Sequence, residues 1–310
     1  MKKLFLLLGS VILGLSLAAC TQSSKSSSDS GSSASTVTFH ALNGNVKIPA
    51  HPTRIAVQNY PDEVLSLGGN VVGTDSWSVV NPYLSKKLSD LGAPKFNLEK
   101  LIEEKPDLII TVDKDQVADY QKIAPTVLVN YQDLAGLNKS LDFFAKLLNR
   151  KTEEKTFLAN FDKTAEVQKK RLSAAGVIPS KLTASIIELS ADKIYAYGSD
   201  FARGGQALTR GLGFSESPAM ADLTKGVGYA ELNAESLGKF DADYIFVDYK
   251  TADSSQFQAL QQNPVWQSMK AVKNKHVVIV DYDKVYFFGG PTASEKQMSL
   301  YVDAILKQTK

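Results

Sequence analysis

Two aromatic-rich segments carry the side chains best suited to holding a small molecule. The first runs from Tyr195 to Gly205 and contains Tyr197, Phe201 and Arg203. Its pattern predicts a strand end, a glycine-rich turn and then a helix. The fork of a guanidinium group can donate several hydrogen bonds to a cluster of anionic oxygens. Arg203 is therefore a candidate ligand contact; the alternative is an arginine that lies on the surface or caps a helix.

The second segment holds three consecutive aromatic residues, Tyr286–Phe288, after an apolar strand predicted at 277–281. Side chains alternate along a strand, so three in a row cannot all face one core. At least one of them should face a cleft or solvent. In the first half of the chain, Tyr60 and Trp77 also follow predicted strands, and each could line a pocket or pack in the core. Aromatic walls bury much area with little loss of side-chain entropy.

Motifs for metal binding or catalysis are absent from the sequence. His40, His51 and His276 are the three histidines, and no Cys/His spacing indicates zinc. The chain has no Gly-x-Ser-x-Gly elbow, no phosphate-binding P-loop and no dinucleotide fingerprint. We therefore predict no catalytic residue, no metal ligand from the protein and no intrinsic cofactor. The formal net charge of +2 gives no reason to expect a nucleic-acid partner.

The elements that must position these residues alternate between strand and helix. A hairpin is predicted around residues 43–45, and parallel βαβ units follow it. The first half has predicted strands at 54–57, 71–73, 108–112 and 126–129, with helices at 61–67 and 98–104. Apolar residues then recur at spacings of three and four from 137 to 175, which predicts two helices, the second long. The alternation resumes with a strand at 183–188.

An internal repeat relates the two halves. Its first copy contains Asn97, Glu99, Leu101, Asp107 and Ile109, and its second contains Asn233, Glu235, Leu237, Asp243 and Ile245 at a constant offset. Chance likeness of two βα segments is the alternative. The sequence predicts an α/β fold of two Rossmann-like lobes, with mostly parallel sheets, one long rigid linking helix and a ligand cleft between the lobes. The lobes are expected at 37–150 and 178–310, with the linking helix at 151–177.

The N-terminal region predicts export. Lys2 and Lys3 precede an apolar run that is shorter than a membrane span, so 1–19 reads as a signal peptide. The sequence ending in Cys20 resembles the lipobox of bacterial lipoproteins, in which the cysteine is acylated. Residues 20–36 are almost entirely small and polar, which is typical of a disordered tether. We expect a lipid-anchored protein on the extracytoplasmic face of the cell membrane.

The chain as a whole resembles the iron–siderophore substrate-binding lipoproteins of ABC importers. The resemblance covers nearly all of the expected mature chain. Its markers are P-x-R-I-A-V from Pro52, L-x-L-G from Leu65, N-L-E-K-L with K-P-D-L-I-I, K-I-A-P-T-V from Lys122, Arg203-Gly204-Gly205, and W-x-x-M-x-A-V-K-N-K-H-V from Trp266. Each marker alone is weak, but their order and spacing are specific for the family.

The resemblance implies a ligand and a partner. Arg203 matches hydroxamate-type members, in which an aromatic residue lies two positions earlier; Phe201 stands where tryptophan is expected and lacks the indole N–H donor. Tyr286 is the cleft-facing residue in the family pattern. The predicted ligand-binding set is Tyr60, Trp77, Tyr197, Phe201, Arg203, Tyr286 and Phe288. The cargo is then a ferric siderophore, which supplies all the oxygen ligands of Fe(III).

Glu99 and Glu235 are the expected docking residues. In the family, one such carboxylate per lobe pairs with arginines of the importer's membrane subunits. Each also follows an asparagine cap in a helix's first turn, where the helix dipole favours negative charge. The two interpretations are compatible. The protein is expected to act as a monomer.

Other ligands and functions stay open at this point. A ferric tricatecholate carries about three negative charges, so its site should hold several converging cations. Lys86, Lys114 or Arg210 could join Arg203, and the site could then hold a catecholate siderophore. Haem or cobalamin would suit the same fold, and Tyr286 could serve as an axial haem ligand. A secreted α/β hydrolase and an adhesin or scaffold lipoprotein are alternatives of other classes.

Overall fold

A computed structural model describes residues 35–308. The predicted signal peptide, Cys20 and tether residues 20–34 lie outside the described residues. The end of the predicted tether is wrong, because Ser35 and Thr36 belong to the folded part. The hairpin of β1 (Thr36–Ala41) and β2 (Gly44–Pro49) is antiparallel, as predicted, and the Ser35 carbonyl accepts a hydrogen bond from the Ala50 N–H.

The first large sheet is built from the first half of the chain and is parallel throughout. Its order is β5–β4–β3–β6–β7, and every neighbouring pair runs parallel. The bounds are β3 Ile55–Val57, β4 Val71–Thr74, β5 Ser89–Asp90, β6 Leu108–Thr111 and β7 Thr126–Leu128. Helices α1 (Pro61–Ser66), α2 (Leu98–Glu103) and α3 (Val117–Tyr120) connect them. The strands are short and almost wholly buried, as expected of a parallel sheet covered on both faces.

The second large sheet is mixed. Its order is β11–β9–β8–β12–β13, with β10 paired to β8. The pairs of β8 with β12, β12 with β13 and β10 with β8 are parallel, whereas β9 is antiparallel to β8 and β11. The bounds are β8 Thr183–Ser190, β9 Lys193–Tyr197, β10 Ser215–Glu216, β11 Tyr229–Leu232, β12 Tyr244–Tyr249 and β13 Val277–Asp281. Its helices are α6 Pro218–Lys225, α7 Ala234–Leu237, α8 Ser254–Gln261, α9 Pro264–Ser268, α10 Lys270–Lys273 and α11 Tyr282–Val285.

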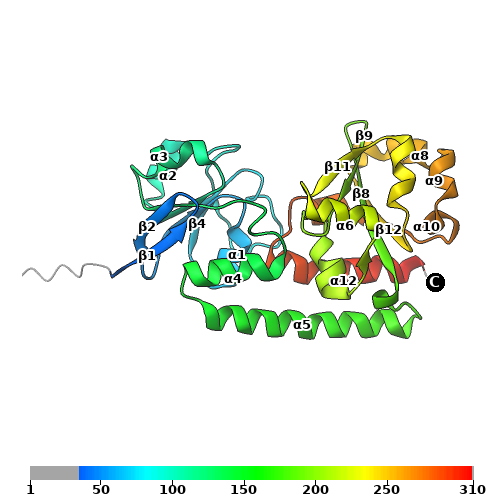
Figure 1. The fold of residues 1–310 in the computed structure, drawn as a ribbon, viewed down its shortest axis with the longest axis horizontal. Coiled ribbons are helices and arrows are strands. Elements are labelled where there is room, and N and C mark those ends of the chain that lie inside the picture. The colour runs from blue at the N-terminus through cyan, green and yellow to red at the C-terminus, as the bar shows by residue number, and fades with distance from the viewer. Residues whose placement is uncertain (1–34, 309–310) are drawn as a thin grey trace, which may run out of the picture. The chain divides into compact units, whose positions relative to one another are not determined.

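Three further helices complete the fold. Two of them lie between the two large sheets in sequence, and the third ends the described chain. The two predicted near 137–175 are α4 (Leu137–Leu147) and α5 (Lys151–Ala174), and the chain ends in α12 (Pro291–Gln308). Helix α5 runs alongside α4 and α12 (Figure 1). At 1.5 Å per residue, its 24 residues extend about 36 Å. The long linking helix of the expected fold is therefore present.

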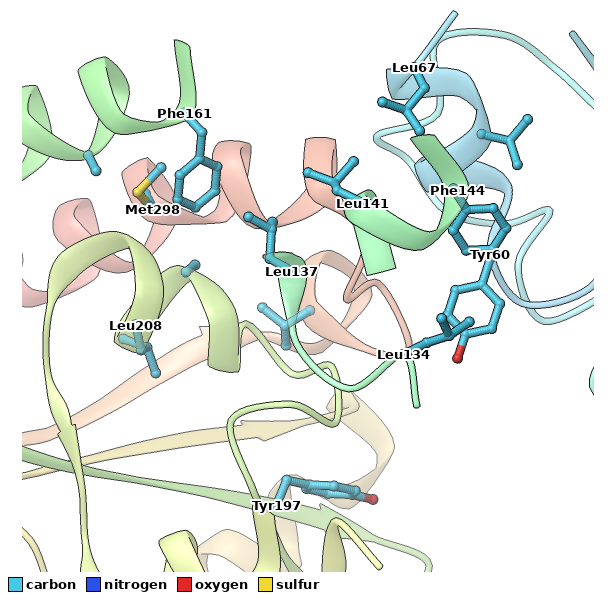
Figure 2. Close-up of a cluster of buried hydrophobic side chains, with 14 of the residues drawn as sticks. Tyr60, Leu67, Leu134, Leu137, Leu141, Phe144, Phe161, Tyr197, Leu208 and Met298 are labelled. Carbon is cyan, nitrogen blue, oxygen red and sulfur yellow. The ribbon is translucent and has the colours of Figure 1, made fainter. Parts of the chain in front are cut away.

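One buried cluster unites residues of both sheets and of these helices. Figure 2 shows Phe161 of α5 beside Met298 of α12, and Phe144 of α4 beside Tyr60. Two helix N-termini are capped across long distances in sequence. The Asp62 carboxylate accepts a hydrogen bond from Ala293 N–H in the first turn of α12 (2.9 Å), and Gln206 Oε1 accepts one from Leu137 N–H at the start of α4 (3.0 Å).

The structure confirms the internal repeat. Asn97 and Asn233 cap helices α2 and α7 through their side-chain oxygens. Asp107, just before β6, accepts a hydrogen bond from Thr53 N–H (2.7 Å) before β3. Asp243, just before β12, does the same for Thr183 N–H (2.8 Å) at the start of β8. Matching residues therefore hold matching strand pairs in the two halves.

Within residues 35–308, no helix has the length and apolarity needed to cross a bilayer.

Candidate functional site

Arg203 lies in a strained turn between β9 and a π-helical segment, Ala207–Leu212. Ala202, Arg203 and Gly204 all have left-handed backbones, with φ of +54°, +51° and +72°. The Tyr301 hydroxyl donates a hydrogen bond to the Arg203 carbonyl (2.5 Å) and fixes the turn to α12. Only glycine fits at position 204, because a Cβ there would lie 2.2 Å from the Tyr301 ring. Strain of this kind persists only where the surroundings impose it, and it clusters at functional sites.

The guanidinium group of Arg203 is buried and only partly satisfied. The residue is 1% exposed, so the alternative of an arginine on the surface is excluded. Its Nε donates to the Glu188 carboxylate on β8, and one terminal nitrogen, Nη2, donates to the Tyr197 hydroxyl (3.3 Å). The other, Nη1, has no hydrogen-bond partner among the described residues. Burial lowers the pKa of Arg203, but Glu188 outweighs this effect and raises it above the ordinary value.

Three aromatic rings cover the guanidinium group. Its Cζ lies 4.4 Å from the centre of the Tyr197 ring, 4.9 Å from that of Tyr286 and 4.6 Å from that of Phe287. Distances of this size are typical of cation–π contacts, which strengthen when water is excluded. Phe201 extends the cluster, since its ring centre lies 5.6 Å from Tyr197 and 6.2 Å from Phe287. The structure thus brings together four of the predicted binding residues, Tyr197, Phe201, Arg203 and Tyr286.

The aromatic segment is a loop between α11 and α12, after the strand β13. Tyr286 follows α11 and is half-buried, Phe287 is 46% exposed and Phe288 is 4% exposed. Gln297 of α12 holds the loop, because its Nε2 donates to the Phe288 carbonyl (2.9 Å) and to that of Lys284 (3.0 Å). Phe287 is therefore the ring presented to solvent, and Phe288 supports the loop from within.

Two exposed residues beside this cluster were missed by sequence reasoning. Tyr229 on β11 is 44% exposed, and its ring centre lies 5.3 Å from Phe201. Val227, just before that strand, is 71% exposed. The short Gly-Val-Gly-Tyr sequence before an apolar strand could have drawn attention to both, since glycine there allows close approach of a second segment. A Cβ on Gly228 would lie 2.7 Å from the Phe201 ring.

In the first half of the chain, Trp77 and Tyr60 have different roles. Trp77 is 43% exposed, and buried Asp75 fixes its loop by accepting hydrogen bonds from Trp77 N–H (3.0 Å) and Asn59 N–H (2.7 Å). Tyr60 is buried and packs on Phe144 at 5.4 Å, so it belongs to the core.

Tyr131 is a better candidate than Tyr60 for a pocket wall. It is half-exposed, its ring centre lies 6.3 Å from that of Tyr60, and its hydroxyl accepts a hydrogen bond from Asn59 Nδ2 (2.7 Å). Tyr131 gave no signal in the sequence, because it follows β7 without any other unusual residue.

Hollows in the described surface lie away from these residues. One of about 1000 Å³ is lined by residues near the amino ends of β3 and β4, including Arg54, Asn70 and Lys86. A second, of about 490 Å³, is lined by Tyr83 and residues of α12. Neither of these two hollows is lined by Arg203 or a predicted binding residue. Because Arg203 is buried beneath three rings, these rings must shift before a ligand can reach its guanidinium group.

The other cations that were candidate ligand contacts either have partners elsewhere or are exposed. Lys86 Nζ donates to Asn70 (2.9 Å), and Arg210 pairs with Asp162 (2.8 Å). Lys114 is exposed in a short 3₁₀ turn, Lys114–Gln116. His276 packs against Tyr244, with the two rings stacked at 4.4 Å. Among residues 35–308, no cluster of three or more His, Cys, Asp or Glu side chains could hold a metal ion.

The two candidate docking carboxylates occupy equivalent, exposed positions. Glu99 and Glu235 each lie in the first turn of a helix capped by asparagine. Neither forms an ion pair within the part of the chain that the structure describes. Both are therefore accessible to a partner.

Comparison with known proteins places this architecture in a family. The iron(3+)-hydroxamate-binding protein YxeB of Bacillus subtilis is 36% identical over 100% of this chain and 99% of its own length. The iron(3+)-hydroxamate-binding protein FhuD of the same organism is 32% identical over 99% of this chain and 98% of its length. The structure of Staphylococcus aureus FhuD2 with bound ferrioxamine B is similar with a TM-score of 0.70 and 27% identity, covering 84% of this chain and 100% of that one. A family model described as "Periplasmic binding protein" matches residues 56–283. The chain belongs to the periplasmic binding protein family.

Proposed function

We propose that this protein captures a ferric trihydroxamate siderophore outside the cytoplasm and delivers it to an ABC importer. Family membership supports a binding role. The full-length likeness to two hydroxamate-binding relatives supports the cargo class. The observation that carries the choice of ligand is the buried ion pair between Arg203 and Glu188.

The charge of that pair favours hydroxamate over catecholate. Three hydroxamate anions cancel the charge of Fe(III), whereas a ferric tricatecholate keeps about three negative charges and needs converging cations. Glu188 neutralises Arg203. Of the other candidate cations, Arg210 pairs with Asp162, Lys86 donates to Asn70 beside a hollow that no site residue lines, and Lys114 lies in an exposed turn. The site therefore offers a hydrogen-bond donor, Nη1, with little net positive charge. A neutral chelate with oxygen acceptors fits this better than a trianion does.

The aromatic residues suit the rest of such a ligand. The exposed rings of Phe287 and Tyr229 flank the half-buried Phe201, and Trp77 and Tyr131 present similar rings from the first half of the chain. Rings of this kind can bury the apolar linkers of a chelate at low entropic cost. Iron would travel inside the siderophore, whose oxygens satisfy it, so the protein needs neither a metal ligand nor an intrinsic cofactor.

Delivery would use the two exposed carboxylates and the lipid anchor. Glu99 and Glu235 could each pair with a cation on one membrane subunit of the importer, which would fix the register of docking. Acylation at Cys20 would hold the protein, acting as a monomer, at the extracytoplasmic face of the membrane. Its lobes would correspond to residues 37–150 and 178–310, with 151–177 as the linking helix.

A fluorescence titration tests the cargo class. The intrinsic tryptophan emission of the purified protein is followed with ferrichrome, ferrioxamine B, a ferric tricatecholate, haem and cobalamin. We expect submicromolar dissociation constants for the two ferric hydroxamates and binding at least about a hundredfold weaker, or about 2.7 kcal/mol, for the others. Equal or tighter binding of the tricatecholate, haem or cobalamin would reject the proposed cargo.

A further inference from the structure

A second buried carboxyl group, Asp248, lies beside the Arg203–Glu188 pair. It occupies β12, and its register partner on the neighbouring parallel strand β8 is Glu188. Register partners on adjacent strands point to the same face of a sheet, so the two carboxyl groups are neighbours. Asp248 is 1% exposed, and neither of its oxygens has a hydrogen-bond partner in the described part of the chain.

The titratable groups that interact with Asp248 come from β8, β9, the turn after β9 and α12, while buried Tyr282 on α11 interacts with Glu188 and Arg203. Those that interact with Asp248 are Glu188 on β8, Tyr197 on β9, Arg203 in the turn after β9 and Tyr301 on α12. Two of them are already engaged, because the Tyr197 hydroxyl accepts from Arg203 and the Tyr301 hydroxyl donates to the Arg203 carbonyl. Arg203 is the single cation among these groups, so it faces two carboxyl groups.

One cation cannot neutralise two buried carboxylates, so ionisation of both would leave a net negative charge in an interior with little water. A buried charge without a partner is costly, and a carboxyl group usually avoids the cost by holding its proton. Burial raises the pKa of Asp248 well above its ordinary value; Arg203 lowers it, and the adjacent Glu188 raises it further. One proton held between the two carboxyl groups leaves them with a single negative charge, which matches the single charge of Arg203.

We propose that Asp248 is a positioning residue for ligand capture: as a neutral acid beside Glu188 it leaves Nη1 of Arg203 free for the siderophore, and once ionised it competes with the ligand for Arg203. This inference rests on the proposed function, because it concerns the same arginine. Asp248 acts on Arg203 through its charge and is too deeply buried to contact the ligand itself.

Affinity should therefore depend on pH in one direction. Ionisation of Asp248 adds a second negative charge beneath Arg203, so ligand binding weakens as pH rises. By linkage, ligand binding at alkaline pH then favours the protonated form of Asp248 and takes up a proton.

The test measures ferrichrome binding across pH for the wild type and two variants. Ferrichrome has no titrating group between about pH 5.5 and about pH 9.5, so a change in its affinity over this range reports on a group of the protein. Over this range we expect the wild-type dissociation constant to rise about tenfold or more. Asp248→Asn, which is nearly isosteric and stays neutral, should bind as the wild type does near pH 5.5 and show no such rise. Asp222→Asn, on the exposed face of α6, is the matched control and should follow the wild type.

Each outcome separates the two proposals. If Asp248→Asn binds ferrichrome with the wild-type pH dependence, or is weakened equally at every pH, the role of Asp248 is rejected and the proposed function stands. If the wild type binds no ferrichrome at any pH, both are rejected. If Asp248→Asn fails to fold, calorimetry of ferrichrome binding to the wild type in buffers of different ionisation enthalpy measures the proton uptake instead. Proton uptake on binding at alkaline pH supports the role, and its absence at every pH overturns it.

Discussion

Arg203 is held in place before any ligand arrives. Glu188 and Tyr197 fix two of its nitrogens, and three rings surround its plane. Pre-organisation of this kind lowers the entropic cost of binding. It also means that removing the arginine does more than remove a ligand contact.

We predict different outcomes for two substitutions of Arg203. Arg203→Ala leaves Glu188 buried without a cation, which should reduce the free energy of unfolding by about 3–5 kcal/mol. Arg203→Lys keeps the charge but loses the fork, so ferrichrome affinity should fall at least about tenfold with a smaller loss of stability. Urea unfolding and fluorescence titration of both variants measure the two effects. Full ferrichrome affinity in Arg203→Lys would contradict the role given to the fork.

Phe287 and Phe288 form a matched pair that separates binding from packing. Phe287→Ala should leave stability nearly unchanged, because the side chain is half-exposed, yet it should weaken ferrichrome binding severalfold. Phe288→Ala removes a buried ring and should cost about 3–5 kcal/mol of stability. Thermal melting and titration of the two variants side by side provide the comparison. A reversed pattern would mean that the ring facing the ligand has been misassigned.

At the scale of secondary-structure elements, α1 carries two buried carboxyl groups, Asp62 and Glu63. Asp62 caps α12, and burial raises its pKa to about 6. Burial, followed by the charge of Asp62, raises the pKa of Glu63 from 4.5 to about 8. In the folded protein Glu63 therefore keeps its proton at neutral pH, whereas in the unfolded chain it is ionised. The stability that Glu63 contributes should fall as pH rises from 4.5 towards about 8, by up to about 1.4 kcal/mol per pH unit, and Asp62 adds a further loss below about pH 6.

Glu63→Gln should remove that dependence. The amide is neutral at every pH, so the free energy of unfolding should change less between pH 5 and pH 8 than it does in the wild type. Urea unfolding of both proteins at about pH 5, about pH 6.5 and about pH 8 measures the slope. Parallel slopes for the two proteins would show that Glu63 does not hold a proton in the folded state.

The helices and most strands were predictable, because their signals are local. The spacing of Leu141, Phe144, Ala145 and Leu148 predicted an amphipathic α4, and the repeated asparagine caps predicted the starts of α2 and α7. The antiparallel direction of β9 could have been predicted, because the two residues between β8 and β9 are too few for a parallel crossover. The pairing of β11 with β9 was not predictable. The partner and direction of β11 depend on contacts with a strand far away in the sequence.

The candidate site was predicted in outline only. Arg203, Phe201 and Tyr286 come together as expected, but Glu188 and Asp248 were overlooked. Each is a single acid within an otherwise apolar strand, in Ser-Ile-Ile-Glu-Leu and Tyr-Ile-Phe-Val-Asp. A buried carboxyl group needs a cation or a proton, so these isolated acids were a usable signal for a partner such as Arg203. The arginine itself is buried because its turn packs against α12 and the segment after α11. Such contacts between distant segments cannot be predicted from local sequence.

At the scale of the whole molecule, the repeat places one exposed carboxylate on each half of the chain. We predict that Glu99→Lys and Glu235→Lys leave ferrichrome affinity unchanged, because neither residue belongs to the aromatic cluster. Uptake of iron from ferrichrome by cells that depend on this protein should fall at least tenfold for each reversal, as like charges meet at the importer. Glu166→Lys on the exposed face of α5 is the control and should transport normally. Normal uptake by both docking variants would reject the proposed docking role.

The central claim is that Arg203, beneath its aromatic rings, receives a ferric hydroxamate. A crystal structure of the ferrichrome complex tests it most directly. The account predicts that the chelate lies against Trp77, Phe201 and Phe287, with a hydroxamate oxygen within hydrogen-bond distance of Arg203 Nη1 and the Glu188 pair intact. A chelate bound at another surface, with Arg203 still covered by Phe287 and its Nη1 still unpaired, would contradict it.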